Sequence, residues 1–316
     1  MSERFQEEQI NLADLISQPE IFRQLADNLQ KSIAFEAIKS RGLRGLKQYG
    51  RFFALFWAYG LLEPDRAKLL KSSYFWLRHV DDIADGEKAL PVNYQSKQEF
   101  LQSKRAACKN LFSGKSTAVG DREDILLVDY LSISRKLGID LEEESLNVLD
   151  TIIFDEERAR NRRIPNQQEL DDYFQKLDSA CVGGAIKVAG DSFQSNDLSD
   201  LSWATRIVFN LRDFPRDFAQ GIINISREDM NKYMVDAIKL QEKASVEQLL
   251  TYKPMREWYA DQTESGLRFL GRAKDRLSNL DLRFVSRLAL ELNFVRPAWQ
   301  TLSKYRGLLR IAGNHF

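Results

Sequence analysis

Glycine, proline and cysteine are all scarce in this chain of 316 residues, which holds 16 glycines, 7 prolines and 2 cysteines. An all-β fold of this length needs more turn residues than this, so the composition argues against one. Hydrophobic residues make up 43% and charged residues 29% of the chain, a mixture typical of amphipathic helices packed on one another. We therefore predict an all-α fold, a single-domain bundle of roughly ten or more helices.

The two cysteines, Cys108 and Cys181, lie far apart and belong to no CxxC motif or histidine cluster. Neither a disulfide framework nor a zinc site is indicated. The first residues lack the basic and apolar regions of a signal peptide, and the longest apolar stretch, 52–62, is shorter than the roughly 20 residues that span a bilayer. We expect a cytoplasmic protein and leave peripheral contact with a membrane open.

Charge of either sign is not in excess, because 46 basic and 46 acidic residues give a formal net charge of zero. A global electrostatic reason to bind nucleic acid is therefore missing, and we predict no such partner. The sequence also has no P-loop and no GxGxxG fingerprint, so binding of NADPH is not indicated, although its participation stays open. The oligomeric state is not predicted.

The chain divides best near residue 45. Residues 1–45 read as a polar, helix-compatible extension, which we expect to break within the glycine-containing segment 40–50. A helical domain then covers residues 46–316. Within it, Pro64 suits the first turn of a helix, and Asn166 with Glu169 three residues later predicts a helix start.

Two pairs of aspartates share a spacing of four residues: Asp81 with Asp85, and Asp213 with Asp217. Residues four apart on a helix lie on one face, where two carboxylates repel each other. A Mg²⁺ ion relieves that repulsion and characteristically takes one or two carboxylates, waters and phosphate oxygens. Two such helices facing each other would form a cage for a diphosphate. The alternative is two solvated helix ends with intrahelical Arg–Asp pairs.

The setting of these pairs favours the functional interpretation. Arg78 precedes Asp81 by one turn, Arg212 adjoins Asp213, and both helices are strongly apolar. Carboxylates on an apolar helix need a partner or a metal ion.

The segment 61–85 resembles the first signature of the squalene/phytoene synthase family, in which a Tyr, an Arg four residues later and Asp-Asp-x-x-Asp follow one another. The matching residues are Tyr74, Arg78, Asp81, Asp82 and Asp85. The second signature resembles Arg212, Asp213 and Asp217, and the element between them resembles Tyr173, Val182 and Gly183.

This resemblance implies an isoprenoid-synthase-type fold, with helices around a central isoprenoid pocket in a catalytic domain over residues 46–316. It also implies head-to-head condensation of two farnesyl or geranylgeranyl diphosphates, with release of diphosphate. The implied metal is Mg²⁺, held by Asp81, Asp82, Asp85, Asp213 and Asp217, of which all but Asp82 are the catalytic residues. Arg78 and Arg212 would bind the diphosphate, and Tyr74, Tyr173, Val182 and Gly183 would contact the substrate.

Other residues of the predicted site carry explicit alternatives. Phe53 could line the pocket beside a carbocation, or belong to the core. Arg51 could bind phosphate in place of a missing hydroxyl-rich stretch, or be a surface charge. Val182 and Gly183 could admit an isoprenoid tail, or let two helices approach closely.

The second signature departs from the family pattern. Phe209 occupies the position of the metal-helix Asn, with Asn210 shifted by one residue as a substitute on the same face. The Gly-Arg-x-Tyr-x-Pro that normally follows reads Gly-Ile-Ile-Asn-Ile-Ser over 221–226, without the basic and phenolic groups. These losses favour one prenyl diphosphate bound normally and an unusual acceptor. Arg158, Arg160, Arg162 and Arg163 form a basic cluster that could draw in diphosphates, or be a solvated charge run at a helix end.

Three functions follow from these observations. The first is a Mg²⁺-dependent prenyl transferase of the squalene/phytoene synthase type. The second is a relative that transfers a prenyl group to a non-isoprenoid acceptor, or cyclises or hydrolyses it. The third is a catalytically silent helical protein that binds lipid or assists assembly, which would have no need of both aspartate pairs.

Overall fold

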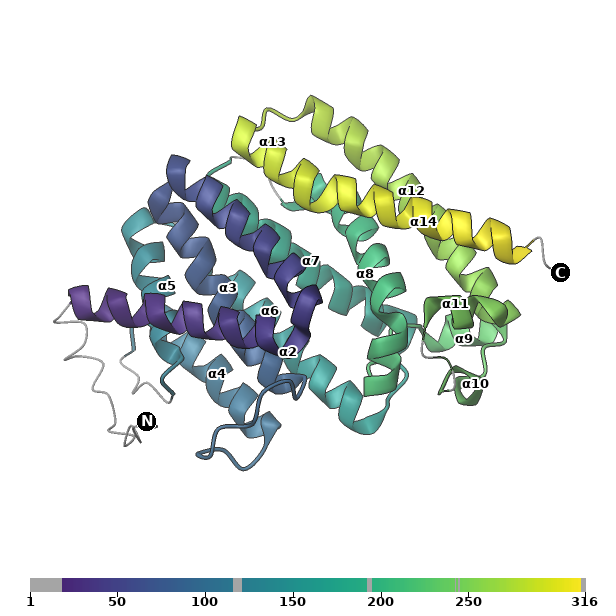
Figure 1. Cartoon of the computed structure of the whole chain (residues 1–316), viewed down its shortest axis with the longest axis horizontal. Helices are drawn as coiled ribbons and strands as arrows, with labels where there is room; N and C mark the ends of the chain where they lie inside the picture. Colours follow the sequence, from purple (N-terminus) through teal and green to yellow (C-terminus); the bar gives the residue numbers. More distant parts are fainter. Residues whose placement is uncertain (1–18, 116–120, 192–194, 242, 244, 314–316) are drawn as a thin grey trace. The chain divides into compact units, whose positions relative to one another are not determined.

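A computed structural model describes residues 19–115, 121–191, 195–241, 243 and 245–313 (Figure 1). Every regular element in these ranges is a helix, which confirms the predicted all-α fold. Within the same ranges, no helix is both long and apolar enough to cross a membrane. Contacts divide the chain into two compact units, residues 1–150 and 151–316, and the boundary predicted near residue 45 stays a prediction.

The first unit contains α2 (Pro19–Leu62), α3 (Pro64–Ala84), α4 (Lys97–Phe112), α5 (Asp124–Leu137) and the start of α6 (Glu142–Asn161). The predicted break within 40–50 is wrong, because the backbone of α2 stays helical throughout this segment. A glycine inside a helix costs only about 1 kcal/mol, and no proline interrupts the segment. Figure 1 shows that α2 changes direction along its length instead. Pro64 lies in the first turn of α3, as predicted.

A buried lysine ties α4 to the N-terminal end of α5. The side chain of Lys104 is 1% exposed, and its Nζ lies 2.7 Å from both carboxylate oxygens of Asp124 and also contacts Asp121. The indole of Trp76 on α3 donates to Asp124 Oδ1 at 3.4 Å. Two carboxylates around one ammonium keep it charged despite burial, and accordingly the pKa of Lys104 is raised above its usual value.

We expect Lys104→Met to destabilise the protein by about 3–5 kcal/mol, since it leaves two buried carboxylates without their cation. Thermal or urea denaturation measures this loss. Adding Asp121→Asn and Asp124→Asn to the same variant should recover part of the stability. Equal stability of Lys104→Met and the wild type would contradict this account of the network.

The second unit contains the rest of α6, α7 (Gln167–Ala189), η1 (Ser195–Leu198), α8 (Ser199–Gln220), α9 (Arg227–Tyr233), α10 (Ala237–Gln241), α11 (Val246–Thr251), α12 (Lys253–Asn279), α13 (Phe284–Leu290), η2 (Glu291–Val295) and α14 (Arg296–Gly313). The predicted start at Asn166 is confirmed, because its side chain accepts from the Glu169 N–H while Glu169 bonds back to the Asn166 N–H.

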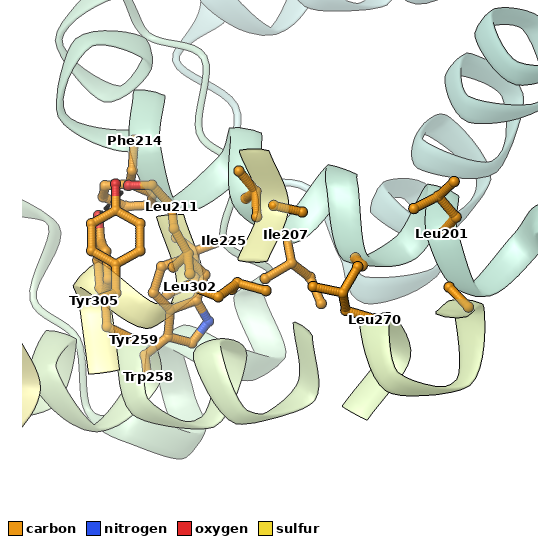
Figure 2. Close-up of a cluster of buried hydrophobic side chains, with 14 of the residues drawn as sticks. Leu201, Ile207, Leu211, Phe214, Ile225, Trp258, Tyr259, Leu270, Leu302 and Tyr305 are labelled. Carbon is orange, nitrogen blue, oxygen red and sulfur yellow. Dashed lines mark hydrogen bonds between the residues drawn. The ribbon is translucent and has the colours of Figure 1, made fainter. Parts of the chain in front are cut away.

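The core of the second unit lies between α8, α12 and α14. Figure 2 shows Ile207 and Leu211 of α8, Trp258 and Tyr259 of α12 and Leu302 of α14 gathered in one buried cluster. Gly266 on α12 makes this close packing possible, because a Cβ there would lie 2.9 Å from Leu302 Cδ2 and 3.2 Å from Ile207 Cγ2. The site-bearing helix α8 is therefore held along its length by two neighbours.

Candidate active site

The first aspartate pair lies at the C-terminal end of α3. Asp81 and Asp85 are partly exposed, whereas Asp82 between them is buried. Asp81 and Asp85 are four residues apart, one helical turn, and the Asp85 N–H donates to the Asp81 carbonyl at 2.8 Å. The structure therefore leaves Asp81 and Asp85 accessible to an external cation and turns Asp82 inward.

Arg78 sits at the centre of this acidic cluster. Its Nη1 lies 2.7 Å from Asp81 Oδ2, and its Nη2 contacts Asp82 and lies 3.2 Å from Glu87 Oε2. The Arg78 side chain is only 15% exposed. The intrahelical Arg–Asp pairs expected for a solvated helix end are thus present, but their arginine is largely buried. Glu87, in the turn after α3, is a member that the sequence pattern did not indicate.

Tyr74 lies one turn before Arg78 in a group of aromatic side chains. Its ring centroid is 5.4 Å from that of Phe75 and 6.0 Å from that of Phe56. Phe75 is fully buried, and Tyr74 is partly exposed. The side chains of Arg51 and Phe53, both predicted to contact substrate, lie outside the described residues, so their placement stays a prediction.

The second aspartate pair lies near the C-terminal end of α8, and each aspartate is bound by the arginine that precedes it. Arg212 Nε donates to Asp213 Oδ1 at 2.9 Å, and Arg216 Nη2 donates to Asp217 Oδ1 at 3.0 Å. Both arginines are more than half exposed, whereas the side chains of Asp213 and Asp217 are 22% and 14% exposed. Arg216 is a second cation of the site that the sequence pattern did not indicate.

Pro215 lies between the two aspartates in the interior of α8, a position where proline usually breaks or kinks a helix. It has no N–H to donate to the carbonyl of Leu211, four residues earlier. The hydroxyl of Tyr259 on α12 donates to that carbonyl at 2.9 Å instead, and Tyr259 is fully buried. The proline therefore leaves no unpaired backbone acceptor at this point.

Burial raises the pKa of Asp217 to about 6. Arg216 opposes this rise, whereas the negative charges of Asp213 and Asp155 add to it. The ionised carboxylate is therefore poorly compensated by the chain itself, which is a state that a divalent cation would relieve.

A buried network supports Asp217 from the other side. Asn224 Nδ2 donates to Asp217 Oδ2 at 3.4 Å, and Arg158 Nη2 donates to Asn224 Oδ1 at 3.0 Å. Arg158 also donates to the Ile223 carbonyl at 3.0 Å and pairs with Asp155. Arg158 is completely buried, so the expectation of a solvated cluster is wrong for this residue. Ile223 and Asn224 lie in the turn after α8, so the local sequence around Arg158 gives no sign of these two partners.

Tyr173 joins the same network, since its hydroxyl donates to Asp155 Oδ2 at 2.7 Å. Its ring packs on Phe154 and Phe174, with centroids 5.4 and 5.3 Å away. Val182 and Gly183, further along α7, are buried, and Val182 belongs to the core cluster of the unit. The structure therefore joins Tyr173 to Asp217 through bonded side chains and places Val182 and Gly183 within packed helices.

Asn210 and Phe209, the two residues at the position of the family's metal-helix Asn, have different surroundings. Asn210 is buried, and its Nδ2 donates to the Asn224 carbonyl at 2.9 Å. Phe209 is 37% exposed and lies under the guanidinium of Arg212, 4.8 Å from the ring centroid. Asn210 thus fixes the turn after α8, whereas Phe209 stacks against a predicted diphosphate ligand.

Both pairs suit a magnesium ion that also binds substrate. Among the described residues, no three His, Cys, Asp or Glu side chains converge as a complete metal site. Mg²⁺ does not need one, because it commonly takes one or two carboxylates and completes its shell with water and phosphate oxygens. Asp81 with Asp85 and Asp213 with Asp217 each offer that number of oxygen ligands.

Comparison with known proteins agrees with this geometry. The sequence profile described as squalene/phytoene synthase matches residues 46–294, which include both aspartate pairs, and the chain belongs to this family. Among solved structures, squalene synthase HpnC from Alicyclobacillus acidocaldarius is similar, with 14% identity, a TM-score of 0.59, and coverage of 96% of this chain and 95% of that one. This likeness shows that the fold is the same. The search of curated proteins finds no match.

Removing the negative charge of Asp217 should stabilise the protein when no metal ion is bound. Because the pKa of Asp217 in the folded chain is raised to about 6 from 3.8, the folded state holds a proton that the unfolded state releases between these pH values. The stability that this proton gives is present at low pH and is lost as the pH rises through about 6. Asp217→Asn should therefore raise the unfolding free energy by about 2 kcal/mol at pH 7.5 in EDTA, and by about half as much at pH 5, where the carboxyl group of the unfolded chain is already mostly ionised.

Thermal denaturation at both pH values measures this difference. Asp200→Asn on the same helix is the control, because its carboxylate is paired with Arg272 at 2.8 Å and its loss should not stabilise the fold. A lower melting temperature for Asp217→Asn at pH 7.5 would contradict the prediction.

Proposed function

We propose that this protein is a Mg²⁺-dependent prenyl transferase that condenses two molecules of farnesyl or geranylgeranyl diphosphate head to head and releases diphosphate. The observation that carries the proposal is the presence of two pairs of i, i+4 aspartates, one at the end of α3 and one on α8. Each pair has an arginine bonded to its first aspartate, and both pairs lie within the family match over residues 46–294. Metabolically this is isoprenoid biosynthesis.

Asp81 and Asp85 would hold Mg²⁺ at the first site, and Asp213 and Asp217 would hold it at the second. When bound, the metal ions neutralise the negative charge that develops on the departing diphosphate. Asp82 has a different role in this proposal, because it is buried against Arg78 and keeps that guanidinium in place. Its charge then offsets the cation rather than coordinating metal.

The arginines bind the phosphoryl oxygens. Arg212 is 53% exposed, and its guanidinium lies over the Phe209 ring, 4.8 Å from the ring centroid, so its donors can reach a diphosphate from the surface. Arg78 is fixed by three carboxylates and contributes a steady positive potential more than a mobile ligand. Its rigid position requires little reorganisation when the leaving group becomes charged.

Aromatic side chains beside Arg78 exclude water and stabilise positive charge. Tyr74, Phe75 and Phe56 form a contiguous group one turn from the acidic cluster. Ring faces attract a cation, and a dry wall prevents water from capturing an allylic carbocation. Tyr74 is the member of this group that is partly exposed, and we assign it the contact with substrate.

The second site uses groups other than the usual ones. Asn224 stands where the family pattern has a tyrosine, and its amide bonds to Asp217. The arginine of that pattern is Ile222 here, while Arg216 places a guanidinium beside the same aspartate from within α8. We assign Arg216 the cationic role at the second diphosphate.

Product analysis tests the proposal. Purified protein is incubated with farnesyl or geranylgeranyl diphosphate and Mg²⁺, with and without NADPH, and products are identified by mass spectrometry. We expect a C30 or C40 hydrocarbon or its cyclopropyl precursor. Asp81→Ala and Asp213→Ala should each lower the rate by about a thousandfold or more, because each removes a ligand that acts on the transition state.

Binding of the prenyl diphosphate without a coupled product would instead favour transfer to a non-isoprenoid acceptor. The altered second signature is the observation that suggests this alternative. A thermal shift assay distinguishes the silent-protein alternative. An enzyme of this type should be stabilised by Mg²⁺ only when a prenyl diphosphate is present. If neither stabilisation nor turnover is observed, the proposed function is refuted.

A further inference from the structure

The last helices of the chain expose large apolar side chains. Phe284 and Leu288 on α13, Leu292 on η2, and Trp299 and Ile311 on α14 are 77%, 45%, 48%, 52% and 59% exposed. Phe284, Leu288 and Leu292 are four residues apart, which places them on one side of the helix. We call this surface, made by the exposed side chains of residues 283–311, the C-terminal face.

The opposite side of the same helices is already buried in the second unit. Leu290, Val295, Ala298, Leu302 and Tyr305 all belong to its core. Packing within the unit therefore accounts for one side of these helices and leaves the apolar side chains of the C-terminal face in water. Figure 1 shows α13 and α14 following one another alongside α12.

The C-terminal face is also strongly basic. It carries one acidic side chain, Glu291, and six basic ones, all exposed: Arg283, Arg287, Arg296, Lys304, Arg306 and Arg310. Six positive charges and one negative charge give a net charge of +5, whereas the whole chain has a formal net charge of zero. The rest of the chain therefore carries a net charge of −5 (0 − 5), so the positive excess is a feature of the face itself.

We propose that the C-terminal face docks on a membrane surface that contains anionic lipids. Apolar side chains, among them a tryptophan, with arginine and lysine around them are what an interfacial helix uses: the apolar groups enter the boundary between headgroups and acyl chains, and the cations meet lipid phosphates. A second copy of the chain fits less well, because a symmetric contact would place two faces of charge +5 against each other.

This docking surface is independent of the proposed reaction, since it rests on exposure and charge and not on the aspartate pairs. Vesicle binding can be measured without substrate, so its failure and the failure of the proposed function are distinguishable. If both hold, the surface brings the enzyme to the phase into which a hydrocarbon product would partition.

The experiment is flotation of the full-length chain with vesicles of phosphatidylcholine alone or with about 30% phosphatidylserine. We expect binding to the anionic vesicles that falls at least tenfold when phosphatidylserine is omitted, or when salt is raised from about 0.1 M to about 0.5 M. Arg296→Glu/Arg310→Glu and Phe284→Ser/Trp299→Ser should each weaken binding at least tenfold.

Matched controls carry the same changes elsewhere. Lys109→Glu/Lys176→Glu alters two exposed lysines on α4 and α7, and Phe35→Ser/Ile238→Ser alters side chains that are 68% and 72% exposed. Circular dichroism and melting temperature confirm that each variant folds. The proposal is overturned if the face variants bind as well as the controls, if no vesicle is bound, or if sedimentation shows that the face variants abolish a dimer instead.

Discussion

A carboxylate that is buried on an apolar helix is stable only beside a positive charge. Both units contain ion pairs that meet this requirement. Asp124 meets Lys104, Asp82 meets Arg78, Asp155 meets Arg158, and Asp178 meets Arg206 at 2.8 Å. In each case the cation is itself mostly buried, so the charges compensate each other inside the protein. Asp217 differs, because its arginine is 59% exposed and its own side chain is nearly dry.

Under the proposed function, the first group of acids holds the fold together and Asp217 binds the ligand. Internal pairs such as Lys104 with Asp124 need no further ligand, and they hold helices together. Asp213 and Asp217 each have one exposed arginine as partner, and burial still raises the pKa of Asp217 to about 6. In the proposed function a divalent cation binds these two carboxylates and supplies the missing compensation.

Elements whose cause is local could be predicted from the sequence. The capping box at Asn166, the helix start at Pro64 and the all-α class depend on a few adjacent residues or on overall composition. The continuity of α2 could not be predicted, because the cost of its glycines is small beside the packing of the helix. Arg158 looked like one member of a basic run, but its partners, Asn224 and the Ile223 carbonyl, lie more than 60 residues away. Asn224 gave no signal for the same reason. Glu87 gave none because the sequence does not show that the turn after α3 brings it back to Arg78, nine residues earlier.

The proline of α8 has a consequence for how the second aspartate pair meets its ligand. The Tyr259 hydroxyl donates to the Leu211 carbonyl that Pro215 leaves without its helical donor. This bond to α12 fixes the rotation of the helical turn that carries Asp213. The direction in which Asp213 and Asp217 point is thus settled by a phenol in the core, before any ligand arrives. In the proposed function, such preorganisation lowers the entropic cost of ordering these carboxylates around a metal ion.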